Sequence, residues 1–229
     1  MIEFPRTGLD SMKKEFDMSE LRTNFLREAK DIKIKDENRN AEGALLITPN
    51  GKRSNLKEAY WRIARTSSFK SWFGDWESKS SCSVVVDENG EPKVMTHRAD
   101  KMLTDALPPR EKFSVSSRFM HFTSEWKGTE STWRYGKVTN FAFLNARKML
   151  DAGAGGMKYY DYPNSQRAGF VHNIDDDFLK FLISNGYDAA YASGVDRDNY
   201  TGPLMYTDEL VVLNPPSQVL FIESVRDSE

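Results

Sequence analysis

Residues 208–216 hold two acidic side chains, then four apolar residues, an asparagine and a Pro-Pro pair. The Leu-Val-Val-Leu run at 210–213 predicts a buried strand, because short apolar runs of this kind favour core strands. The prolines end that strand, since proline cannot donate to a strand ladder. Glu209 opens the strand, where a carboxylate can be held rigidly at the edge of a cleft and stabilise positive charge. The alternative is a solvated glutamate beside a turn.

Composition narrows the class of protein. The 229 residues fit one domain, or one domain with a helical extension, and 39% hydrophobic residues supply a core. A net charge of −2 argues against a protein that coats nucleic acid or an anionic membrane. Cys82 is the only cysteine and the three histidines lack HExxH-type spacing, so we expect neither an intrachain disulfide nor a metal site. Residues 1–14 lack the apolar core of a signal peptide and no apolar run is long enough for a bilayer, which predicts a cytoplasmic location.

Three segments have helical signals. Residues 12–32 carry apolar side chains at helical spacing, with Asp17 as the expected N-cap. Asn55 is expected to cap a second helix that runs through Ile63. A third helix is predicted at 178–185, with Gly186 at its end. Four aromatic residues between 69 and 76 predict core or an interdomain seam, with a ligand platform as the minority alternative.

Short strands account for much of the remainder. A hairpin is predicted around Asn89-Gly90, which favours a tight turn. The region 150–166 is rich in glycine and tyrosine and is interpreted as a mobile loop, and 193–203 as a polar loop. Further strands are predicted at 44–48, 83–86, 93–96, 120–123, 137–144, 189–191 and 219–222. This pattern predicts an α+β protein with a split, mostly antiparallel β core and helices at its margins.

Several segments together resemble one family. These segments are Pro49 to Leu56, Arg65-Thr66, Phe69-Lys70, Trp72 to Trp76 and Val86 to Pro92. They resemble the segment that precedes the first functional motif, here called the lead-in, of ADP-ribosyltransferase domains in phage and mobile-element polyvalent proteins. The similarity covers roughly residues 45–223, and 206–219 also resembles the corresponding strand of poly-ADP-ribose polymerases. The resemblance implies an ADP-ribosyltransferase-type fold at 44–229, with its aromatic lead-in at 44–80. Residues 1–43 would form an N-terminal helical extension.

The family's functional motifs are shorter and more divergent here. Its Tyr-His-Gly-Thr strand end matches Thr96-His97-Arg98-Ala99, and its Tyr-Phe-Thr-Asp strand matches His121-Phe122-Thr123-Ser124. Gly186 to Ala190 resembles its Gly-Tyr-Asp-Gly-Ile, and the strand-opening glutamate matches Glu209. The resemblance implies an enzyme that uses NAD as co-substrate and transfers ADP-ribose to a host macromolecule, with protein as the expected target.

The same resemblance assigns roles to residues. Glu209 would be the catalytic carboxylate that stabilises the oxocarbenium-like ribosyl cation formed when the nicotinamide bond breaks. His97 would hydrogen-bond the adenosine ribose, and Phe122 would stack on the nicotinamide ring. Thr123 and Ser124 would offer hydroxyls to NAD.

Two departures from the family pattern leave alternatives open. Arg98 replaces a glycine, and in a second register it would itself be the NAD contact. Thr207 lies two residues before Glu209, where arginine-modifying relatives carry Glu or Gln, which argues against arginine as acceptor. An NAD glycohydrolase is one alternative function, and a non-catalytic binding module of the same fold is another. A nucleic-acid acceptor is less expected because of the acidic net charge. The segments 150–166 and 193–203 would dock the acceptor.

Overall fold

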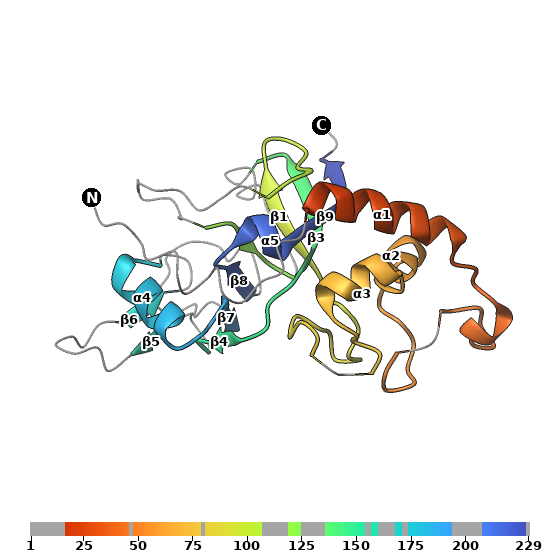
Figure 1. The fold of residues 1–229 in the computed structure, drawn as a ribbon, viewed down its shortest axis with the longest axis horizontal. Coiled ribbons are helices and arrows are strands. Elements are labelled where there is room, and N and C mark those ends of the chain that lie inside the picture. Colours follow the sequence, from red (N-terminus) through yellow and green to blue (C-terminus); the bar gives the residue numbers. More distant parts are fainter. Residues whose placement is uncertain are drawn as a thin grey trace.

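The structure is a computed structural model of an α+β protein, which confirms the predicted class. It describes residues 17–45, 48–78, 81–106, 119–124, 136–153, 157–159, 168–170, 174–193 and 208–227. Figure 1 shows helices α1, α2 and α3 gathered at one end of the molecule, α4 at the opposite end, and strands between them.

Two sheets form the centre of the molecule. One contains β1 (Val94–Ala99), β3 (Val138–Leu144) and β9 (Val219–Arg226) in the order β1-β3-β9. The other has the order β2-β8-β7-β4, from β2 (His121–Phe122), β8 (Asp208–Val212), β7 (Ala189–Ser193) and β4 (Met149–Asp151). Among the described strands only β4 and β7 pair in parallel, as expected for a mostly antiparallel core. A bridge between Thr96 and Thr123 connects the edge strands β1 and β2, so the two sheets meet there.

The region predicted as a loop at 150–166 contains regular structure. Met149–Asp151 is strand β4, and β5 (Met157–Tyr159) pairs with β6 (Ala168–Phe170) as a small hairpin. The loop prediction was therefore wrong for these residues. The parallel partner that β4 finds in β7 is distant in sequence, and local glycine content carries no information about such a partner.

The N-terminal helices pack on one face of the β1-β3-β9 sheet. Helix α1 (Met18–Asp31) begins at Asp17, whose carboxylate accepts from the backbone N–H groups of Ser19 and Glu20, as predicted. A short 3₁₀ turn, η1 (Asp36–Asn38), follows. Leu21, Phe25 and Ala29 of α1 share one core cluster with residues of α2 and α3 and with Phe143 and Leu220 of the sheet. The predicted boundary near residue 43 is therefore crossed by a common core.

The aromatic segment 69–76 belongs to this core. Helix α3 (Ser67–Phe73) carries Phe69, Trp72 and Phe73, which are all fully buried, and Trp76 follows at 1% exposed. The Phe69 and Phe73 rings stack at 5.1 Å. The Nε1 groups of both tryptophans donate to backbone carbonyls, which satisfies their buried polar atoms. These contacts agree with the core interpretation of the segment rather than with a ligand platform.

Asn55 does not cap the second helix. Helix α2 (Glu58–Ala64) begins after Lys57, which makes no side-chain cap. The amide of Asn55 donates instead to the carboxylates of Asp87 and Glu88, 2.9 and 2.7 Å away. This contact ties the turn before α2 to the turn before β1. The predicted helix forms, but the side chain that was expected to cap it binds Asp87 and Glu88 instead.

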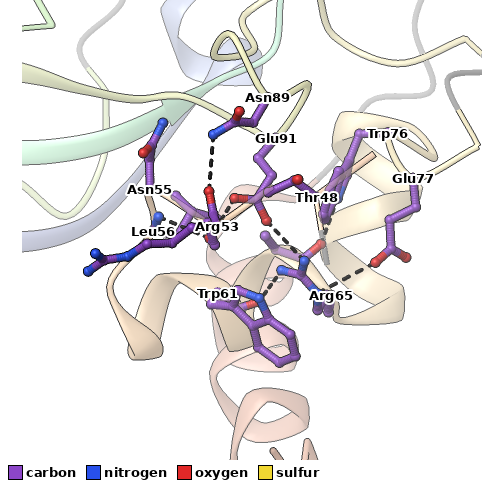
Figure 2. A network of polar contacts seen from close by, with 12 residues as sticks. Thr48, Arg53, Asn55, Leu56, Trp61, Arg65, Trp76, Glu77, Asn89 and Glu91 are labelled. Carbon is purple, nitrogen blue, oxygen red and sulfur yellow. Dashed lines mark hydrogen bonds and ion pairs between the residues drawn. The ribbon is translucent and has the colours of Figure 1, made fainter. Parts of the chain in front are cut away.

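A buried ion pair links the same two regions (Figure 2). Glu91 is fully buried, and it accepts hydrogen bonds from Arg65 at 2.9 Å and from Ser54 at 2.5 Å. The Arg65 guanidinium lies 3.8 Å from the ring centroid of Trp61 and 4.9 Å from that of Trp76. A charge placed in the core needs such partners, because desolvation without them is costly. The network fixes the segment that leads directly into β1.

The turn predicted around Asn89-Gly90 forms, and of its two short flanking strands the one predicted at 93–96 is confirmed as the start of β1, whereas the one predicted at 83–86 is reduced to a bridge. Val86 and Pro92 make an isolated bridge, and β1 begins only at Val94. Gly90 has a φ of 81°, a left-handed conformation that glycine adopts without strain. Likewise, the strand predicted at 44–48 is reduced to a bridge between Leu45 and Arg39 in the described part of the segment.

Two further core clusters lie around the β2-β8-β7-β4 sheet. Phe122, Leu210 and Val212 pack with Met95 and Phe221 between the two sheets. Val211 and Leu213 pack on the other side with α4 (Asp176–Ser184). The short helix α5 (Pro215–Gln218) begins at the Pro-Pro pair and leads into β9.

Removing the cap of α4 should destabilise this second side of the sheet. The Asp175 carboxylate accepts from the backbone N–H of Phe178 at 2.8 Å, and Asp175→Ala leaves that donor without its partner. Loss of an N-cap costs about 1 kcal/mol of unfolding free energy. We expect a lower urea midpoint with an unchanged m value. Asp177→Ala, in the same first turn but outside the cap, should change the midpoint much less.

Candidate active site at the junction of the two sheets

The predicted functional histidine lies where β1 meets β2. The Nδ1 atom of His97 is 2.8 Å from the carbonyl oxygen of His121. A carbonyl oxygen only accepts, so the proton of His97 is on Nδ1 and its Nε2 atom is an acceptor. The His97 ring also lies 5.5 Å from that of Phe122, tilted by 46°. Two segments that are far apart in the sequence thus place a ring with a fixed tautomer at the sheet junction.

Glu209 lies in β8 beside β2 and is only 7% exposed. Its Oε1 atom accepts a hydrogen bond from Nδ1 of His121. The ladder makes this contact possible, because His121 lies opposite Val211 and Phe122 opposite Leu210. The motif match included His121 without assigning it a role. The signal that identifies it is its position in the β2-β8 register, which only the fold reveals.

Burial lowers the pKa of His97 below its ordinary value of 6.5, the hydrogen bond to the His121 carbonyl opposes that shift, and the nearby His121 ring adds to it. The native state therefore binds fewer protons than the unfolded state below that value. The contribution of neutral His97 to the free energy of unfolding is therefore fully present above about pH 6.5, and it is lost as the pH falls through the lowered pKa of this residue.

This sign gives a measurable expectation. In urea unfolding of the wild type, the free energy of unfolding should decrease as the pH falls below about 6.5, since protonating a buried imidazole costs native stability. His97→Gln removes the titrating ring and should flatten that decrease. An equal pH dependence in the two proteins would assign the titration to other groups.

Phe122 is buried in the core between the sheets. Its ring is 1% exposed and lies 6.3 Å from that of Phe221. The packing thus makes Phe122 a core residue, and its stacking on nicotinamide stays a prediction.

Thr123 and Ser124 make contacts that the sequence did not indicate. Both hydroxyls donate to the carboxylate of Asp208, at 2.8 Å in each case. Asp208 is 4% exposed and precedes Glu209 in β8. An acidic pair at a strand start is the only sequence signal for Asp208. Which acid faces which side of the strand depends on register and could not be predicted.

Arg98 points away from His97, because successive side chains of a strand lie on opposite faces. Its guanidinium donates to the carbonyl oxygen of Gly136 at 2.8 and 3.1 Å and to the Thr139 hydroxyl at 3.1 Å. It also pairs with the carboxylate of Asp227. The structure therefore links His97 to His121 and Phe122, and His121 to Glu209, whereas Arg98 lies on the opposite face of β1 from His97.

Parts of the predicted site lie outside the described residues. These are Thr207 and most of the two segments expected to dock an acceptor. In the part of the chain that the structure describes, no helix has the length and apolar character needed to cross a membrane. Within the same residues, no group of histidine, cysteine and acidic side chains is arranged to hold a metal ion.

The chain matches none of the protein-family models and none of the curated proteins with which it was compared.

Proposed function

We propose that this protein is a mono-ADP-ribosyltransferase that cleaves the nicotinamide–ribose bond of NAD and transfers ADP-ribose to a protein target. The observation that carries the proposal is the meeting of three sequence motifs at one point of the fold. His97 on β1, His121 and Phe122 on β2, and Glu209 on β8 are separated by many residues, yet they are neighbours at the sheet junction.

The chemistry of these groups fits the reaction. Breaking the nicotinamide bond leaves positive charge on the ribose, and a carboxylate fixed beside it stabilises that charge most where water is excluded. Glu209 is nearly buried, and its hydrogen bond from His121 fixes its orientation. Such preorganisation lowers the barrier because the carboxylate need not reorient during the reaction. His97 presents Nε2 as an acceptor, which suits a ribose hydroxyl.

The experiment incubates the protein with NAD labelled in the adenylate part and with a lysate of host cells. The proposal expects discrete labelled protein bands together with free nicotinamide. Nicotinamide without labelled macromolecules would replace the proposal with an NAD glycohydrolase. A label removed by nuclease would indicate a nucleic-acid acceptor. No NAD consumption and no thermal shift with NAD would contradict an enzyme and leave a binding module.

A further inference from the structure

Among the described residues, the carboxylate of Asp208 contacts more side chains at the sheet junction than the carboxylate of Glu209 does. It accepts from the hydroxyl of Thr123 at 2.8 Å, and from the backbone N–H and hydroxyl of Ser124 at 2.7 and 2.8 Å. The hydroxyl of Tyr191 on β7 lies 3.4 Å away, and the ammonium of Lys93 lies 3.6 Å away. One buried side chain thus contacts the end of β2, strand β7 and the residue before β1.

These contacts matter because β2 is very short. The described strand has two residues, His121 and Phe122, each with one ladder partner in β8. A slip of one residue would turn His121 to the opposite face and remove it from Glu209. Two ladder pairs resist such a slip weakly, and the bridge between Thr123 and Thr96 ties this segment to β1 rather than to β8. The three hydrogen bonds from Thr123 and Ser124 to Asp208 lie directly after the ladder and hold its register.

Asp208 and Glu209 have separate tasks in this arrangement. Neighbouring side chains of a strand point to opposite faces. The core contacts follow this alternation, since Leu210 and Val212 belong to the cluster between the sheets and Val211 to the cluster under α4. Asp208 therefore binds the end of β2 on one face of β8, while Glu209 contacts His121 on the other face.

We propose that Asp208 is a positioning residue, which locks the register of β2 on β8 so that His121 holds the carboxylate of Glu209 in place. The value of this arrangement for catalysis rests on the proposed role of Glu209. The arrangement itself can be tested without NAD.

The test reads the tautomer of the His121 ring by ¹⁵N–¹H correlation NMR of the intact protein. In the wild type we expect the Nδ1–H form, because Nδ1 donates to Glu209. In Asp208→Ala we expect loss of that form and a shift toward the Nε2–H form that a free imidazole favours. Asp208→Asn keeps an acceptor for Thr123 and Ser124 and should restore much of the Nδ1–H signal.

Asp227→Ala is the matched control. Like Asp208, Asp227 binds a partner through its carboxylate, but that partner is Arg98 on the β1-β3-β9 sheet. The His121 signal should stay as in the wild type. If Asp208→Ala does not fold, Thr123→Val combined with Ser124→Ala removes the two hydroxyl partners and should produce the same shift.

An unchanged His121 tautomer in folded Asp208→Ala, or in the Thr123 and Ser124 double variant, would overturn the inference. NAD turnover gives an independent arm. If Asp208 is a positioning residue, Asp208→Ala should lower kcat about 10-fold or more with little change in KM, as expected when the lost group orients a transition-state contact. If wild-type protein does not cleave NAD while the tautomer still shifts, the proposed function fails and the positioning role stands.

Discussion

Glu209→Gln should lower the rate of NAD cleavage about 100- to 1,000-fold, the usual loss when a preorganised electrostatic group is removed from an active site. Glutamine has nearly the same shape, and its side-chain oxygen can still accept from Nδ1 of His121. The variant therefore removes the negative charge and leaves the geometry of the site. The loss should appear in kcat, because in the proposed mechanism the carboxylate acts on charge that exists only in the transition state. Release of nicotinamide from saturating NAD measures it.

Glu37→Gln makes the same chemical change at a side chain that is 70% exposed, far from the sheet junction. It should retain wild-type turnover. Equal melting temperatures for wild type and Glu209→Gln would show that the loss is not a folding defect. A folded Glu209→Gln protein with wild-type kcat would remove Glu209 from the reaction.

Arg65→Met should destabilise the protein by about 3–5 kcal/mol at neutral pH, because it leaves a buried carboxylate without its cation. The Arg65 side chain is 9% exposed and that of Glu91 is fully buried, so solvent screens their pair little. Methionine retains a long apolar side chain between Trp61 and Trp76. Urea unfolding at about pH 7 measures the effect, and a change below about 1 kcal/mol would contradict the account of the pair.

The destabilisation should depend on pH. Burial raises the pKa of Glu91 above its ordinary value of 4.5, while hydrogen bonds from Ser54 and Arg65 oppose the shift. Without Arg65 the pKa of Glu91 rises further. A carboxyl group with a raised native pKa keeps its full contribution to stability below its unfolded value and loses it as the pH rises. The difference between wild type and variant should therefore widen from about pH 5 to pH 7.

The double variant Arg65→Met with Glu91→Leu distinguishes the loss of the ion pair itself from the cost of leaving the Glu91 carboxylate buried without a cation. Two apolar side chains of similar volume often replace a buried ion pair with little loss of stability. We expect the double variant to recover most of the free energy lost in Arg65→Met and to show no widening with pH. A double variant as unstable as the single one would place the cost in packing around the tryptophans.

Local patterns predicted many elements of this fold and missed others for one reason. The caps at Asp17 and the acidic start of α4 are local hydrogen bonds, and the structure has both. The strand after Glu209 is an apolar run that needs no distant information. By contrast, β4 exists because β7 lies beside it, and Asn55 fails to cap α2 because Asp87 and Glu88 accept its amide instead. Those outcomes depend on partners that are remote in sequence.

The sequence by itself predicted the α+β class, the core position of the aromatic segment and a buried strand at Glu209, although that strand begins one residue earlier, at Asp208. It also supplied the resemblance that first assigned His97 and Glu209 to one site. Only the tertiary structure placed His121 against Glu209, Arg98 on the opposite face from His97, and Asp208 on Thr123 and Ser124. Residue type and spacing fix what a side chain can do chemically. Strand register and sheet contact decide which side chains meet, and both arise from pairing between distant segments.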